Sequence, residues 1–181
     1  KEKLGNRSNA SSEIEFRNTI GYLVGGVGRG VPTIIEMVNH TRLDCAIGSA
    51  SLMRQSLVQA MHHGRHRSAF GKSLKDQPLM RSVFADLAVE AEAAQLLMLR
   101  LAHSYDNPKA DDGEDAFRRI TSAVSKYWLC KRATPFVGEA LECLGGNGYV
   151  EESVMPRLFR ESPLNSIWEG AGNVICLDVM R

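Results

Sequence analysis

Residues 31–63 read VPTIIEMVNHTRLDCAIGSASLMRQSLVQAMHH, and this stretch decides the fold. Its apolar residues recur every three or four positions, which is the spacing of one face of an α-helix. They are Val31, Ile34, Ile35, Val38, Cys45, Ala46, Leu52, Met53, Leu57, Ala60 and Met61. Pro32 falls in the first turn, where its fixed φ suits a helix. The pattern predicts an amphipathic helix roughly 50 Å long, which needs partners for its apolar face.

Two further stretches, about 77–105 and about 114–144, repeat this periodicity. The Asn-Pro pair at 107–108 and Gly113 separate them and predict a loop, because proline and glycine disfavour helix interiors. Pro135 lies inside the later stretch. Its ring clashes with the preceding turn of a helix, so we predict a kink or a break there.

The glycine-rich stretch 145–148 predicts the end of the third helix, and a short segment follows at about 155–161. A last helix is predicted from about Gly170 and stops with the chain at Arg181. Three long amphipathic helices and the start of a fourth, joined by short loops, form an antiparallel helix bundle. Strands do not alternate with helices, which argues against a Rossmann-type sheet. The predicted fold class is mostly α, with a four-helix-bundle domain over residues 25–181.

Residues 1–24 have a different pattern. The motif EIEFR at 13–17 alternates polar and apolar residues, so we predict short strands or extended chain for this β remnant. The glycine-rich turn at 25–30 invites comparison with nucleotide-binding loops. The dinucleotide fingerprint requires glycine at position 31 and the P-loop requires lysine there, but that residue is Val31. The turn is therefore interpreted as a connector into the first helix.

Composition excludes several classes of function. The chain has 22 Lys and Arg against 21 Asp and Glu, a net charge of +1, which gives no general attraction for nucleic acid or anionic membranes. No apolar run approaches the ~18–20 residues of a membrane span. The cysteines lack the Cys-x-x-Cys steps of zinc sites, so we predict reduced thiols, no metal site and a cytoplasmic protein. They are Cys45, Cys130, Cys143 and Cys176.

Three turns carry residues suited to ligand binding. The stretch 65–72, RHRSAFGK, places basic side chains around an aromatic ring, which suits a phosphate-bearing ligand or a plain solvated turn. The stretch 145–149, GGNGY, exposes backbone N–H groups or simply ends a helix. The stretch 165–173, NSIWEGAGN, places Glu169 where it serves as a general base or as a helix cap. Antiparallel bundles bring alternate loops to one end, so we expect the three to meet.

These motifs together resemble the C-terminal helical domain of the acyl-CoA dehydrogenase superfamily. The resemblance rests on Arg67-x-x-Phe-Gly-Lys, on Leu-Gly-Gly-Asn-Gly-Tyr at 144–149 and on Trp-Glu-Gly at 168–170, in the family's order. The stretches 142–157 and 165–181 are most similar to its alkylation-response, AidB-like branch. The start, KLGNR at 3–7, is similar to the last strands of the family's middle β-domain, which implies that residues 1–24 are the tail of that domain.

The resemblance implies a role for each matching residue. Glu169 matches the catalytic base, which takes the α-proton of an acyl-CoA thioester while a hydride leaves for flavin N5. The residues matching FAD contacts are Arg67, Phe70, Gln77, Glu142, Gly145, Gly146 and Asn173. The residues matching the acyl-CoA site are Asn39, Arg42, Gly170 and Arg181. Arg67 and Phe70 match positions that receive FAD from a neighbouring subunit, which implies a homodimer or homotetramer.

Some positions depart from the family pattern. Glu142 stands where glutamine is usual, Trp168 where tyrosine is usual, and Ala171 where threonine is usual. Two hypotheses follow: an FAD-dependent acyl-CoA dehydrogenase, or a flavin-carrying DNA alkylation-response protein with vestigial dehydrogenation. DNA contact in the second is expected from a region outside this chain. Because the chain lacks an initial methionine and stops at Arg181 inside an apolar pattern, we expect a piece of a longer protein that is inactive alone.

Overall fold

The computed structural model describes residues 1–106 and 112–181, and most of it is helical. The long helices are α1 (Gly30–His66), α2 (Pro78–Asp106) and α3 (Asp112–Glu142). The short helices are α4 (Gly146–Tyr149), α5 (Met155–Glu161) and α6 (Gly172–Val179), with 3₁₀ turns η1 (Leu74–Asp76) and η2 (Leu164–Ser166). Strands β1 (Ser68–Ala69) and β2 (Lys72–Ser73) form a small antiparallel hairpin. The predicted fold class is confirmed.

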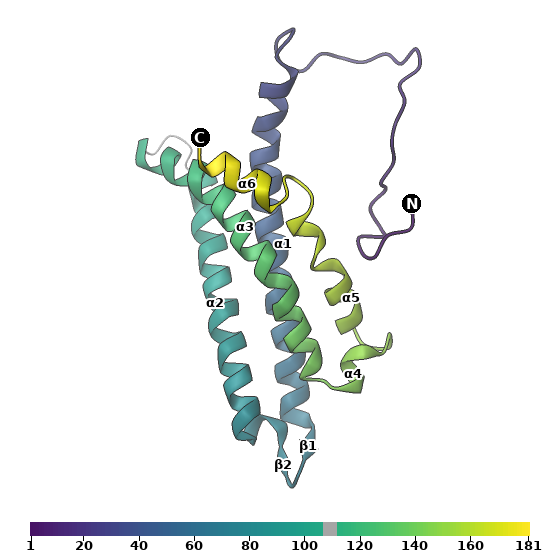
Figure 1. Cartoon of the computed structure of the whole chain (residues 1–181), viewed down its shortest axis with the longest axis vertical. Helices are drawn as coiled ribbons and strands as arrows, with labels where there is room; N and C mark the ends of the chain where they lie inside the picture. The colour runs from purple at the N-terminus through teal and green to yellow at the C-terminus, as the bar shows by residue number, and fades with distance from the viewer. Residues whose placement is uncertain (107–111) are drawn as a thin grey trace.

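The three long helices run up and down beside one another (Figure 1). Helix α1 packs against both α2 and α3, and the β1–β2 hairpin joins its end to α2. After α3 the chain turns back through α4, and α5 runs along the outer side of α1 and α3. Helix α6 then crosses α3 near the opposite end of the bundle. The course of the chain through α4 and α5 decides where the loop between η2 and α6 lies.

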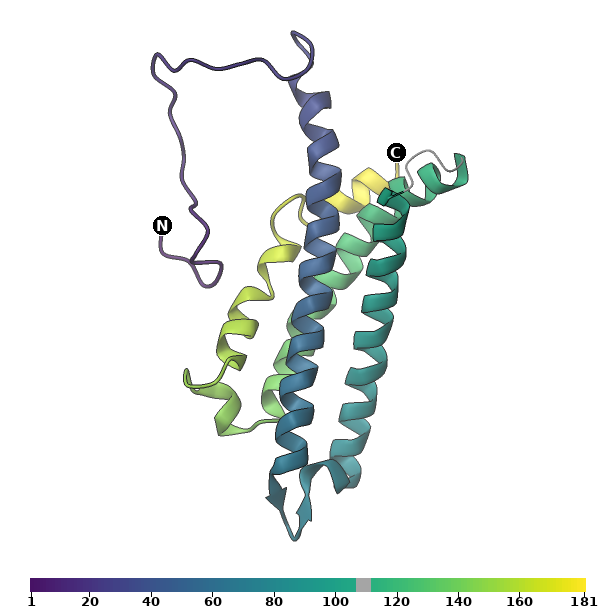
Figure 2. The same cartoon turned by 180° about the vertical axis from the view of Figure 1, so that it is seen from behind.

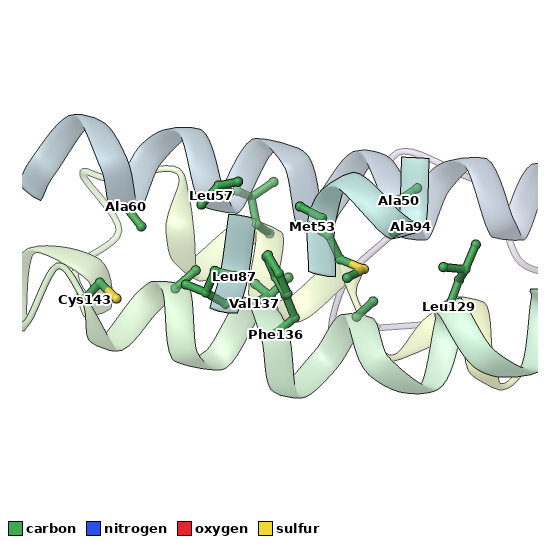
Figure 3. Packing of buried hydrophobic residues seen from close by; sticks show 14 of the residues in the cluster. Ala50, Met53, Leu57, Ala60, Leu87, Ala94, Leu129, Phe136, Val137 and Cys143 are labelled. Carbon is green, nitrogen blue, oxygen red and sulfur yellow. The ribbon is translucent and has the colours of Figure 1, made fainter. Parts of the chain in front are cut away.

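The core between the long helices alternates small and large side chains (Figure 3). Alanines let the helices approach closely, and larger side chains fill the spaces between them. The large residues are Met53, Leu57, Phe84, Leu87, Leu129, Phe136 and Val137, and the small ones include Ala50, Ala60, Ala94 and Ala133. Gly64 makes room for an aromatic ring, because a Cβ there would lie 2.6 Å from the Phe84 ring. The core therefore matches the helical periodicity of the sequence.

Of the two alternatives predicted at Pro135, a kink or a break, the break is wrong, because α3 continues through it. Pro135 is exposed, while the next two residues, Phe136 and Val137, are buried in the core. Packing of these neighbours holds the helix together although the proline lacks an N–H to donate. Gly113 lies inside α3 rather than in a loop, and the Asn-Pro pair at 107–108 is outside the described residues.

The first 29 residues form an extended, exposed segment that arches away from the bundle (Figure 2). Of the predicted alternatives, extended chain rather than strand is what the structure shows. A strand needs a neighbouring strand for its N–H and C=O groups, and residues 1–29 pair with none in the described part of the chain. Near its N-terminal end, at Gly5, the segment contacts the bundle, where the Asn6 N–H donates to Glu161 Oε2 of α5 at 2.8 Å.

Candidate functional site

The turn that carries Glu169 lies between η2 and α6 and has an unusual backbone. Glu169 has φ 56° and Gly170 has φ 100°, so two consecutive residues lie in the left-handed region. Glycine adopts this conformation freely, whereas a glutamate pays a steric cost for it. Non-glycine residues in this region concentrate at functional sites and are held there by surrounding contacts.

Side chains from α1 and α3 supply those contacts. The Thr41 hydroxyl donates to Glu169 Oε2 at 2.8 Å, and Arg42 Nε donates to the Glu169 carbonyl at 3.4 Å. The Lys126 ammonium of α3 donates to the Gly170 carbonyl. The Glu169 N–H has no acceptor among the residues that the structure describes. The turn is therefore fixed by side chains of α1 and α3.

Arg42 also joins the turn to α6. It is buried, and its guanidinium pairs with Asp178 Oδ2 at 2.6 Å, while Arg119 approaches Asp178 Oδ1 at 3.1 Å. Burial alone would raise the pKa of the Asp178 carboxyl, but the hydrogen bond and charge of Arg42, with Arg119, outweigh burial and hold that pKa below its usual value. The carboxylate therefore stays ionised between two cations.

Trp168 is held by a chain of hydrogen bonds that leads into the core. Its indole N–H donates to Asn165 Oδ1 at 3.1 Å, and Asn165 Nδ2 donates to the Ser49 hydroxyl at 3.2 Å. Ser49 in turn donates to Cys130 Sγ at 3.2 Å. Burial raises the pKa of the Cys130 thiol, so this cysteine is a neutral core group. Asn165 and Trp168 also line a pocket of about 410 Å³ between α1 and α5.

The basic–aromatic patch forms the β1–β2 hairpin at the end of α1. Ser68 pairs with Ser73, and the Leu74 N–H donates to the Arg67 carbonyl at 2.8 Å. Phe70 sits at the tip with φ 53° and a side chain that is 99% exposed. Gln77 supports the hairpin, since its Nε2 donates to the Ala69 carbonyl at 2.8 Å. The hairpin therefore presents the ring of Phe70 outward.

The glycine-rich patch begins directly after α3. Gly145 has φ 57°, and a Cβ at Gly145 or Gly146 would meet no atom within 4 Å, so their backbone is open to an approaching ligand. Gly148 is different, because a Cβ there would lie 2.3 Å from the Leu141 carbonyl oxygen. Glu142 is the last residue of α3 and is exposed.

Two of the three patches lie at the same end of the bundle. The hairpin and the glycine turn follow α1 and α3, which end on the same side of the bundle (Figure 1). Glu169 instead contacts Arg42, which lies 25 residues before Arg67, or roughly 37 Å along α1. The expectation that all three patches meet is wrong, because α5 and η2 carry the chain back along the bundle before Glu169.

The predicted acyl-CoA residues lie on the Glu169 side. Asn39 precedes Thr41 by less than one turn of α1, and its carbonyl accepts the Tyr105 hydroxyl at 3.0 Å. Arg181 is exposed at the end of the chain, beyond α6, and Asn173 is exposed in the first turn of α6. Sequence reasoning missed Thr41, Asp178 and Lys126. Only Lys126 had a usable signal, because it shares the spacing of the buried residues of α3.

Comparison with known proteins places the chain in one family. Residues 28–181 match the model of the acyl-CoA dehydrogenase C-terminal domain. The chain is 50% identical over 181 residues to the putative acyl-CoA dehydrogenase AidB of Escherichia coli (strain K12), covering 100% of this chain and 33% of that protein. The chain thus spans about a third of the length of this relative.

Two solved structures share the fold. The structure of Caenorhabditis elegans ACDH-11 in complex with C11-CoA superposes with a TM-score of 0.84 at 35% identity, over 87% of this chain and 27% of that one. The apo-form of Bd2924 superposes with a TM-score of 0.94 at 33% identity, over 100% of this chain and 37% of that one. In residues 1–106 and 112–181, no helix has the length and apolar character to cross a membrane.

Proposed function

The chain belongs to the acyl-CoA dehydrogenase family, whose members are flavin-dependent, and from this premise we propose that it is the helical part of an FAD-dependent acyl-CoA dehydrogenase with Glu169 as the catalytic base. In this proposal residues 25–181 form the helical domain and residues 1–24 the tail of a middle β-domain. The observation that carries it is the strained turn, which fixes the Glu169 carboxylate through Thr41 while leaving the Glu169 N–H without an internal acceptor.

The residues at the hairpin end fit FAD. The exposed ring of Phe70 at the hairpin tip and the basic Arg67 at the base of the hairpin suit an adenine and its phosphates, and the open backbone at Gly145 and Gly146 allows close approach of the pyrophosphate portion. Gln77 supports the hairpin and Glu142 is exposed at the end of α3. Asn173 is exposed at the other end of the bundle, in the first turn of α6, and is proposed to contact a different part of the FAD. The FAD, when bound, supplies the acceptor for the hydride that leaves the β-carbon of the substrate.

Glu169 and its neighbours perform the proton chemistry. The Glu169 carboxylate removes the α-proton of the acyl-CoA thioester, and the Glu169 N–H donates to the thioester carbonyl as negative charge develops there. Arg42 contacts Glu169 and Gly170 follows it in the chain, and these two residues together with Asn39 and Arg181 are proposed to line the acyl-CoA site. Arg42 holds the Glu169 carbonyl, so the base and the donor are fixed in one rigid turn.

The separation of roughly 37 Å along α1 supports a shared cofactor. Within one chain, Phe70 is too far from Glu169 for both residues to contact the same end of one FAD molecule. We therefore propose that Arg67 and Phe70 bind the FAD of a neighbouring subunit. The acyl-CoA dehydrogenase site is then completed only in a homodimer or homotetramer.

The test uses the complete flavoprotein that contains this chain. Glutamine keeps the shape of Glu169 but cannot take a proton, so Glu169→Gln is expected to retain FAD and acyl-CoA and to slow flavin reduction by at least ~100-fold. Glu92→Gln, at an exposed position on α2, is the matched control and should leave reduction unchanged. Stopped-flow bleaching of the flavin absorbance measures the rate.

Two results would contradict the proposal. An unchanged reduction rate in Glu169→Gln assigns the base to another carboxylate. A wild-type flavoprotein that is not reduced by acyl-CoAs of any chain length removes the dehydrogenase function and favours the flavin-carrying alkylation-response protein instead.

A further inference from the structure

Lys126 is a buried cation that the proposed reaction does not use. Its side chain is 1% exposed, and it is the largest fully buried side chain in the described residues. It lies on α3 and sends its ammonium group to the turn between η2 and α6, where it donates to the Gly170 carbonyl. A lysine in such a place carries a desolvation cost that an apolar residue would avoid.

The surroundings of Lys126 show that this cost is real. Burial lowers the pKa of Lys126, and the positive charge of Arg42 adds to that decrease, while the nearby thiols Cys130 and Cys45 and the negative charge of Glu169 act against it. No carboxylate forms an ion pair with Lys126 in the described part of the chain. The hydrogen bond to Gly170 is therefore the specific contact that this buried ammonium makes.

That contact acts on the strained turn. Because a peptide group is planar, fixing the Gly170 carbonyl also fixes the direction of the next N–H, at Ala171, where α6 begins. Arg42 fixes the preceding peptide group through the Glu169 carbonyl. Two cations on two helices thus hold consecutive peptide groups of a turn that has left-handed φ at both Glu169 and Gly170.

We propose that Lys126 is a positioning residue that holds the Glu169–Gly170 turn in its left-handed conformation, and so keeps the Glu169 carboxylate and N–H in reacting geometry. The inference rests on the proposed function of Glu169 as the base. A misplacement of about 1 Å in a catalytic group can slow a reaction by about 100-fold, so a loosened turn has a measurable effect.

A purely stabilising role for Lys126 predicts something different. Replacing a buried charge with an apolar residue of similar volume is often neutral or stabilising. Lys126→Met therefore separates the two roles, because it removes the donor while filling the core. Lys126→Gln provides a rescue, since glutamine and methionine have nearly equal length and differ mainly in the presence of an N–H donor. Lys75→Met controls for the loss of one charge, because Lys75 is exposed and its one ion pair within residues 1–106 and 112–181 is with its neighbour Asp76.

The first measurement uses the 181-residue chain without cofactor. We expect Lys126→Met to shift the amide NMR signals of Gly170 and Ala171 and to speed hydrogen exchange of the first turn of α6 by at least ~10-fold, with unchanged helix content by circular dichroism. Lys126→Gln should keep most of the wild-type shifts, and Lys75→Met should keep all of them. Unchanged Gly170 and Ala171 signals in Lys126→Met would overturn the positioning role, whatever the chain's activity.

The second measurement uses the complete flavoprotein. Lys126→Met should slow flavin reduction by an acyl-CoA at least ~10-fold while its affinity for that acyl-CoA changes by less than about threefold, and Lys126→Gln should recover part of the rate. Equal rates in wild type and Lys126→Met would overturn the inference. A wild-type protein that shows no reduction overturns the proposed function alone, because the NMR measurement still tests Lys126.

Discussion

The ion pair between Arg42 and Asp178 should be the main electrostatic link between α1 and α6. The two groups lie 2.6 Å apart, and their side chains are 10% and 24% exposed. We consider Arg42→Met, which keeps the apolar stem of the arginine and removes its charge. The change breaks the contact with Asp178 and also the hydrogen bond to the Glu169 carbonyl.

The expected loss in the free energy of unfolding follows from how deeply the Arg42–Asp178 pair is buried. Exposed ion pairs contribute about 0.2–1 kcal/mol, and removal of one partner from a fully buried pair costs about 3–5 kcal/mol. This pair is largely buried, but Asp178 keeps a second cation, Arg119, at 3.1 Å after the change. We therefore expect Arg42→Met to reduce the free energy of unfolding by about 2–3 kcal/mol. The part that belongs to the pair itself should be about 1–2 kcal/mol.

A double-mutant cycle measures that part. The free energy of unfolding is determined by urea denaturation for the wild type, Arg42→Met, Asp178→Asn and the double variant, and the interaction energy is the deviation from additivity. The same comparison with Arg119 in place of Arg42 is the matched control, and it should give a smaller energy because Arg119 is half exposed. An interaction energy below about 0.3 kcal/mol for Arg42 and Asp178 would refute the reasoning, since additivity then holds as for distant sites.

Three further predictions concern the acid limit, the glycine turn and the hairpin. The pKa of Asp178 is lower in the folded chain than in the unfolded one, so the ionised carboxylate stabilises the fold above about pH 4. This stabilisation is lost as the pH falls through the folded-state pKa of Asp178. The urea midpoint should therefore fall less between pH 7 and pH 3 in Asp178→Asn than in wild type. Gly148→Ala should destabilise the chain by about 1–3 kcal/mol, because the new Cβ meets the Leu141 carbonyl, whereas Gly146→Ala, with open space around its Cβ, should change the denaturation midpoint little. Phe70→Ala should leave the stability of the chain within about 0.5 kcal/mol, since the ring is exposed, but should weaken FAD retention in the complete flavoprotein; equal flavin content after dialysis would contradict that role.

The helices could be predicted because each one buries a single stripe of apolar residues. That stripe repeats every three or four positions in α1, α2 and α3, and the predicted bounds agree with the structure to within a few residues. The short α5 was also located from its sequence. The break that a local rule predicts as one alternative at Pro135 does not occur, because the buried neighbours Phe136 and Val137 keep α3 continuous through it.

The relative placement of the patches could not be predicted from local patterns. Whether Glu169 lies beside the glycine turn depends on how far the chain travels back along the bundle after α3, and that path is set by the packing of α5 on α1 and α3. The extended form of residues 1–29 has the same kind of cause. Alternating residues favour a strand, but a strand forms only where a second strand supplies hydrogen bonds.

The residues proposed to meet a ligand and the residues that hold them in place have opposite environments. Phe70 is 99% exposed and Gly145 opens to solvent, because groups that meet a ligand lie at turns where the helical periodicity stops. Lys126 at 1% and Arg42 at 8% exposure lie inside helices. No turn marks them in the sequence, so Lys126 is indicated only by its spacing among the buried residues of α3, and Arg42 only by the family resemblance. Substitutions at the turns should therefore change ligand binding with little effect on stability. Substitutions at the buried cations should change the geometry of Glu169 even where the fold survives, so the two kinds of residue can be separated by measuring both properties in the same variants.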